Sequence, residues 1–146
     1  MHLLVRETHA LDAEAGADDL GHSPADLVLL SFSDSDLGAA ASAWETLTGG
    51  PSLRLANLRR LLHPMSVDLY LEQVVASASC VIVRLLGGLG YWRYGVEELA
   101  ALCRHKGIAL ALLPGDGRDD AALEALSTVP PAQRTILGAC LEQGGA

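Results

Sequence analysis

Five short aliphatic runs punctuate the chain, and segments with helical periodicity lie between most of them. The runs cover His2 to Val5, Asp26 to Phe32, Leu53 to Leu58, Cys80 to Leu86 and Ile108 to Leu113. Each run has the length and the apolar character of a strand buried in a sheet. The connections are long enough for crossovers, which predicts that the strands pair in parallel.

Helical stripes separate these runs. The first combines Leu37, Ala40, Ala41, Trp44 and Leu47, after a start at Asp34-Ser35-Asp36. The second combines Val67, Leu71, Val74, Val75 and Ala78, and Ser66 is its predicted N-cap. A third helix has Glu97 and Glu98 near its start and ends before Gly107, which fits a left-handed C-terminal cap.

A last helix is expected over about Pro131 to Gln143. Together the elements predict an α/β fold with a doubly wound, mainly parallel five-stranded sheet, flavodoxin-like and in three layers. With 146 residues, of which 50% are hydrophobic, residues 1–146 are expected to form a single domain around one core.

The charge and the cysteine content limit the expected partners and the expected compartment of the protein. The formal charge is -8 and the ten basic residues are scattered, so neither nucleic acid nor an anionic membrane is an expected partner. The longest uncharged stretch, Gln73 to Val83, is too short to span a bilayer. The three cysteines lie far apart in apolar contexts, which is typical of reduced core residues and predicts a cytoplasmic protein.

Polar residues gather where the predicted strands end. In a parallel sheet these ends share one edge, and ligands bind there. The edge would collect Ser31, Ser33, Asp34, Asn57, His63, Arg84, Gly87, Gly88, Pro114, Gly115, Asp116 and Arg118. The competing interpretation is structural: Asp34 and Ser66 cap helices, the glycines form turns, and Arg84 pairs with Asp34 or Asp116. Either way, Arg84 should be paired or face a ligand.

Most chemistries that need a spaced motif are not supported. Gly88-Leu89-Gly90 lacks the third glycine of a dinucleotide fingerprint, and Lys106 is not set in a phosphate-binding loop. The five histidines lie singly, so no metal set is predicted, and no Gly-x-Ser-x-Gly elbow exists. The sequence therefore predicts no catalytic residue and no cofactor bound by this segment.

Several continuous stretches resemble one enzyme family. They are Asp26 to Gly38, Leu53 to Leu58, His63 to Tyr70, Arg84 to Gly88 with Tyr91-Trp92 and Tyr94-Gly95, and Leu113 to Asp116. In this order they are similar to the start of the large subunit of aerobic cobaltochelatase, the CobN type, within the family of the magnesium chelatase H subunit. The resemblance covers nearly the whole chain and implies an N-terminal fragment of a much longer subunit.

The resemblance also implies a function. The large subunit of that family binds a corrin, hydrogenobyrinic acid a,c-diamide, and Co(II) is inserted while AAA+ type partner subunits hydrolyse ATP. This fragment would support macrocycle binding or dock against later domains. Macrocycle contact would use Arg84, Gly87, Gly88, Tyr91 and Trp92 with Ser33, Asp34 and His63, and Trp92 is expected to be partly exposed. Two alternatives remain: a generic flavodoxin-like module for a small anion or a protein, and the equivalent domain of a magnesium chelatase.

Overall fold

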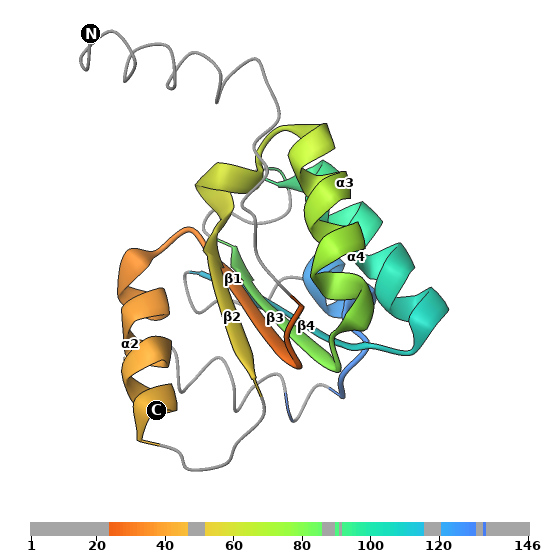
Figure 1. Cartoon of the computed structure of the whole chain (residues 1–146). Coiled ribbons are helices and arrows are strands. Elements are labelled where there is room, and N and C mark those ends of the chain that lie inside the picture. The colour runs from red at the N-terminus through yellow and green to blue at the C-terminus, as the bar shows by residue number, and fades with distance from the viewer. Residues whose placement is uncertain are drawn as a thin grey trace, which may run out of the picture.

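The computed structural model describes residues 24–46, 52–85, 90, 92–115, 121–130 and 133. Within them four strands form one parallel sheet in the order β2-β1-β3-β4 (Figure 1). The strands are β1 (Leu27–Ser31), β2 (Leu53–Asn57), β3 (Cys80–Leu85) and β4 (Ala109–Pro114). They match four of the five predicted strands to within a residue or two. The predicted strand His2 to Val5 lies outside the described residues, so the five-stranded, flavodoxin-like sheet stays a prediction.

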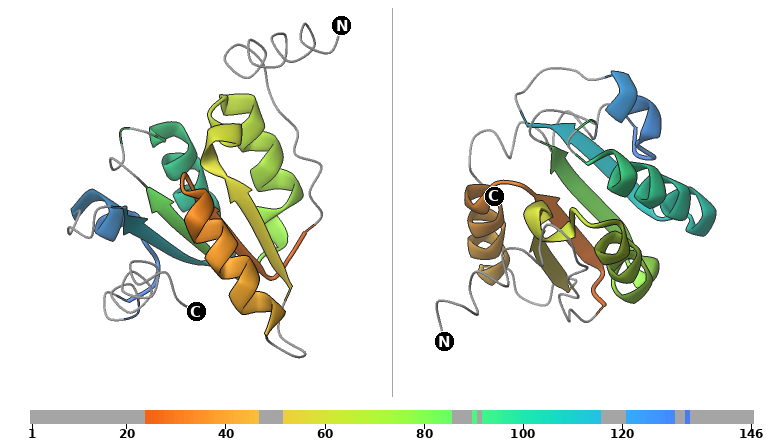
Figure 2. Two further views of the ribbon diagram at one scale, coloured as in Figure 1. Left: turned by 90° about the vertical axis from the view of Figure 1, so that its left-hand side faces the viewer. Right: turned by 90° about the horizontal axis from the view of Figure 1, so that it is seen from above.

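Helices cover both faces of the sheet, which gives the predicted three layers. Helices α3 (Pro64–Gln73) and α4 (Arg93–Lys106) lie side by side on one face, and α2 (Asp34–Glu45) lies on the other (Figure 2). Short 3-10 turns, η1 (Leu58–Leu61) and η2 (Val75–Ser77), flank α3. The short helix α5 (Ala121–Leu126) follows β4 and was not predicted. Of the helix expected over Pro131 to Gln143, only residue 133 is described.

The main core lies between the sheet and the pair α3 and α4. Alternate residues of β3, Val81, Val83 and Leu85, face this core and are fully buried. The predicted stripe of the second helix is buried as well, from Val67 through Ala78. The described residues of the α2 stripe are only half-buried, and the one buried residue of that helix is Asp36.

The sequence made predictions about the end of α4 and the start of α3. Gly107 ends α4 with φ 72°, in the left-handed region, as the sequence predicted. The predicted cap of α3 was wrong: His63 accepts the first-turn bond from the Met65 N–H, and Ser66 lies buried inside the helix. Pro64 explains the earlier start, because proline suits the first helical position.

The outer edge of β4 is closed by hydroxyl groups that follow α5. The Leu110 N–H donates to the Thr128 hydroxyl (2.7 Å) and the Leu112 N–H donates to the Ser127 hydroxyl (3.0 Å). In return the backbone N–H of Thr128 donates to the Leu110 carbonyl (2.8 Å). These bonds satisfy backbone groups that a neighbouring strand would otherwise satisfy.

Candidate functional site

The ends of three strands bring polar side chains to one level of the sheet. In the strand register Ser31 lies beside Asn57 on one side and beside Arg84 on the other. Residues opposite one another in neighbouring strands point to the same face. The prediction that strand-end residues meet is thus confirmed for Ser31, Asn57 and Arg84.

Arg84 is paired, as predicted, but its partner is Asp36. Its guanidinium donates to the Asp36 carboxylate over 2.8 Å and to the Gly115 carbonyl over 3.2 Å. The two side chains are only 12% and 7% exposed, so this ion pair lies largely out of water. A pair this buried depends on both members, because removing one leaves a poorly hydrated charge.

Serine hydroxyls complete this cluster. The Ser31 hydroxyl donates to the second oxygen of Asp36 (2.8 Å) and accepts the Ser33 N–H (3.0 Å). The Ser33 hydroxyl accepts the Asp36 N–H (3.3 Å), which makes Ser33 the N-cap of α2. We call Ser31, Ser33, Asp36 and Arg84 the strand-end network. Each of its members serves as a partner to another member.

Asp34 and His63 also make bonds within the fold. The Asn57 amide donates to the Asp34 carboxylate (2.9 Å), and the Asn57 carbonyl oxygen accepts the Arg59 N–H (2.9 Å). The His63 Nδ1 accepts the Met65 N–H (3.1 Å), so the proton of the neutral ring lies on Nε2. Among the described residues, no buried side-chain nitrogen or oxygen lacks a partner.

Trp92 contradicts the prediction that it is partly exposed. It is 4% exposed, lies within the main core, and donates its indole N–H to the Leu61 carbonyl (2.7 Å). A side chain built at Gly95 would run into the indole ring, so glycine is required for the ring to lie against the first turn of α4. The sequence prediction failed because Trp92 was assigned to a glycine-rich loop, whereas it is the residue that immediately precedes α4.

The described residues on either side of the segment after β3 are held by the fold. The strand-end network holds Arg84 before it, and the core holds Trp92 after it. Gly87, Gly88 and Tyr91, predicted to contact a macrocycle, lie outside the described residues, as do Asp116 and Arg118. Their roles stay predictions.

Of the two described aromatic residues in this region, Trp92 and Tyr94, it is Tyr94 that reaches the surface. It is 40% exposed, and its hydroxyl donates to the Asp68 carboxylate on α3 (2.8 Å). This hydrogen bond, together with desolvation and the negative charges of Asp68 and Glu98, raises the pKa of Tyr94 to about 12. The phenol therefore stays protonated and ties the start of α4 to α3.

The cysteines described are inert core thiols. Cys103 is buried and Cys80 half-buried, and both are free. Burial raises the pKa of Cys103 to about 12 and also raises the pKa of Cys80. Since the thiolate is the nucleophile and the metal ligand, neither residue suits such chemistry at neutral pH.

The described residues show neither a clustered metal ligand set nor a helix suited to cross a membrane. Within the described ranges, no three His, Cys, Asp or Glu side chains come together as a metal ligand set. No helix in the same ranges combines the length and the hydropathy that a bilayer crossing requires.

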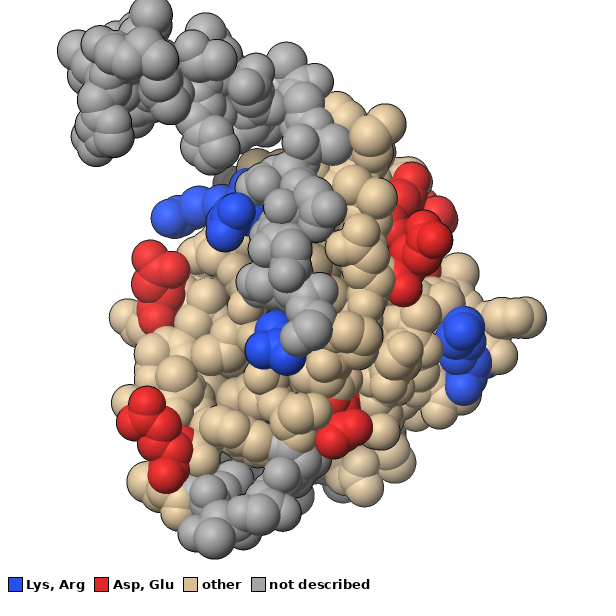
Figure 3. Space-filling view, in the orientation of Figure 1, with Lys and Arg blue, Asp and Glu red and all other residues tan. Residues whose placement is uncertain are grey.

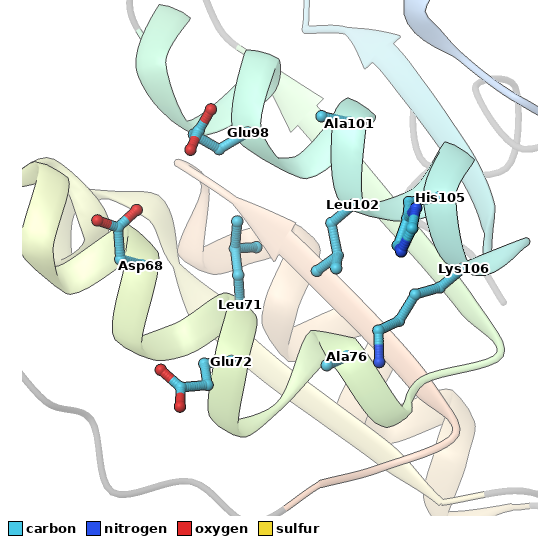
Figure 4. A pocket seen from close by; sticks show the side chains of 9 residues that line it. All are labelled: Asp68, Leu71, Glu72, Ala76, Glu98, Ala101, Leu102, His105 and Lys106. Atoms are coloured by element: carbon cyan, nitrogen blue, oxygen red, sulfur yellow. The ribbon is translucent and has the colours of Figure 1, made fainter.

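A groove between α3 and α4 was missed by the sequence analysis. It has a volume of about 550 Å³ and is lined by Asp68, Leu71, Glu72, Ala76, Glu98, Ala101, Leu102, His105 and Lys106. Leu71 and Leu102 face each other across its middle, with Asp68 and Glu98 toward one end and His105 and Lys106 toward the other (Figure 4). The helical spacing of Asp68, Glu72 and Ala76 could have indicated a shared face, because i, i+4 residues neighbour one another.

Comparison with known proteins gives a consistent result. The aerobic cobaltochelatase subunit CobN of a Sinorhizobium species is 42% identical over 146 residues, which is all of this chain. CobN of Pseudomonas aeruginosa is 43% identical over 99% of the chain. The chain belongs to the CobN family of cobaltochelatase subunits.

The structural comparison agrees with this assignment. The catalytic subunit of cobaltochelatase from Mycobacterium tuberculosis superposes with a TM-score of 0.58 at 31% identity, over 77% of this chain and 8% of that chain. No family model matches the sequence. The chain spans 12% of the length of each curated relative. The likeness therefore concerns one segment of a large subunit.

Proposed function

We propose that this chain is the N-terminal domain of the large subunit of an ATP-dependent cobaltochelatase. The complete subunit would bind hydrogenobyrinic acid a,c-diamide, and Co(II) would be inserted with AAA+ type partner subunits that hydrolyse ATP. The observation that carries the proposal is the 42–43% identity to CobN along essentially the whole chain. Agreement of this extent is not expected of a generic binding module that shares only a fold.

Within that subunit we assign this domain a supporting role. Metal insertion needs ligands that strip water from the ion and a base that removes protons from the macrocycle. The described residues supply no ligand set, and the strand-end network uses its carboxylate and guanidinium internally. Docking against the rest of the subunit is favoured over macrocycle contact, because Trp92 buries its ring in the core.

Reconstitution tests the function. The complete subunit, purified with its AAA+ partners, is expected to convert the corrin diamide to its cobalt form when Co(II) and ATP are supplied, as followed by absorbance. The same mixture is offered a porphyrin with Mg²⁺ as the competing reaction. Magnesium insertion without cobalt insertion would assign the chain to the magnesium enzyme. If the mixture inserted neither metal, the proposal would be overturned.

A second measurement separates docking from macrocycle contact. Tyr91→Ala in the complete subunit should leave the KM for the corrin unchanged if the domain only docks. A raised KM with unchanged kcat would instead show that the segment after β3 binds the macrocycle, because removed binding energy appears there.

A further inference from the structure

The groove between α3 and α4 combines an apolar floor with charges that differ at its two ends. Its floor is formed by Leu71, Ala76, Ala101 and Leu102. Exposed Asp68, Glu72 and Glu98 line one end, and exposed His105 and Lys106 line the other. In Figure 3 acidic side chains gather over α3 and α4, and a basic side chain lies beyond them across uncharged surface.

The apolar surface continues past the acidic end of the groove. Met65, one turn before Asp68 on α3, is 57% exposed, and Leu62 just before α3 is 51% exposed. Tyr94, one turn before Glu98 on α4, holds Asp68 by its hydroxyl. The helix pair thus presents an extended strip in which apolar side chains alternate with carboxylates. Large apolar side chains exposed in one area indicate an interaction surface.

A protein helix suits this strip better than the corrin substrate does. The groove lies along two neighbouring helices, and amphipathic helices bind such grooves through side chains spaced by three and four residues. A macrocycle that carries carboxylates would be repelled by the three acidic residues. A lysine or arginine of a docked helix would instead be attracted by them, and an acidic residue by Lys106.

The docked helix would come from the part of the subunit that lies outside this chain. This chain corresponds to 12% of CobN, so most of the subunit lies outside it. We infer that the α3–α4 groove docks an amphipathic helix from a later part of the same subunit, with a basic side chain against Asp68, Glu72 and Glu98. This inference rests on the proposed function only for the source of the helix.

Cross-linking in the complete subunit tests the occupant. Ala101 is exposed in the groove and can be changed to cysteine; Cys103 is buried, and both Cys140 and the half-buried Cys80 are replaced by alanine beforehand. A photoreactive maleimide on Ala101→Cys is expected to cross-link to a peptide of the same polypeptide that carries Lys or Arg. A matched label on Ser42→Cys, exposed on α2 across the sheet, should not reach that peptide.

Charge reversal gives an independent readout. Glu98→Lys should speed amide hydrogen exchange in α3 and α4 of the complete subunit by about tenfold, which corresponds to about 1.4 kcal/mol of lost docking. Glu45→Lys, an exposed residue of α2, should leave exchange in α3 and α4 unchanged.

The outcomes separate this inference from the proposed function. A cross-link to a partner subunit, to a second copy or to nothing, with equal exchange in both variants, would overturn the groove assignment even if cobalt insertion succeeds. The predicted cross-link in a subunit that fails to insert cobalt would leave the groove assignment standing and reject the function.

Discussion

The strand-end network and the α3–α4 groove both contain acidic side chains, but the two regions use them in opposite ways. In the network the Asp36 carboxylate accepts from Arg84 and Ser31 and is almost fully buried. In the groove Glu72 and Glu98 lie exposed on the outer faces of two helices. The first arrangement contributes to the stability of this chain. The second leaves binding capacity for another part of the subunit.

The largest expected effect lies in the main core. Trp92→Ala should destabilise the chain by about 3–5 kcal/mol, because it empties a core position and leaves the Leu61 carbonyl without its donor. Urea denaturation of the chain measures this loss. Tyr94→Ala, which removes an exposed ring, is the control and should cost far less. Similar losses for both variants would contradict the burial of Trp92.

Next comes the ion pair itself. Asp36→Asn keeps the shape of the side chain but leaves the Arg84 charge without its counterion, so a loss of about 3–5 kcal/mol is expected in the same denaturation assay. Asp34→Asn is the matched control, since Asp34 is exposed and contacts only the Asn57 amide among the bonds described above. If the two substitutions proved equivalent, the network would have no special part in stability.

Glycine substitutions in two helices should have opposite signs. Gly95→Ala places a methyl group into the Trp92 ring and should cost about 1–3 kcal/mol through overpacking. Gly38→Ala in α2 meets open space and should stabilise the chain by about 0.5–1 kcal/mol, because alanine is the better helix former. Denaturation midpoints report both changes. A stable Gly95→Ala variant would show that the ring has room to move.

The smallest expected effect is the pH dependence of the hydrogen bond between Tyr94 and Asp68. Because the pKa of Tyr94 is raised from 10.0 to about 12, its stabilising contribution should be complete below pH 10 and disappear as the pH rises toward 12. Absorbance titration of the phenolate, compared with Tyr94→Phe, isolates this group. Asp68→Ala should return the Tyr94 pKa toward 10. Ionisation of Tyr94 near 10 in the unaltered chain would show that the bond to Asp68 does not persist in solution.

The sequence predicted the layers and the meeting of strand ends because both follow from local patterns. Aliphatic runs located β1 to β4, and Gly107 marked the end of α4. The position of Arg84, a charged residue at the end of the buried strand β3, correctly indicated that its side chain would be paired. The acidic partner of Arg84 was missed because Asp34 and Asp36 are both acidic and differ only in the face of the helix on which they lie. Ser33 as N-cap places Asp36 one turn before Ala40, on the inward stripe, and that spacing was the available signal.

Other features depend on tertiary contacts that periodicity does not contain. The burial of Trp92 requires the Leu61 carbonyl and a side-chain-free Gly95 to lie close to the ring. The groove needs two helices separated in sequence to present their faces side by side. Neither condition is set by the residues of one element, so both became visible only in the folded chain.

The hydroxyl groups along β4 affect at which edge of the sheet a further strand could be added. With Leu110 and Leu112 already bonded to Thr128 and Ser127, an added strand at that edge would have to displace these hydrogen bonds before it formed its own. β2 is the other outer strand of the four described. Among the four described strands, β2 is therefore the edge at which a further strand, whether from the same subunit or from a misfolded neighbour, would not have to displace these bonds.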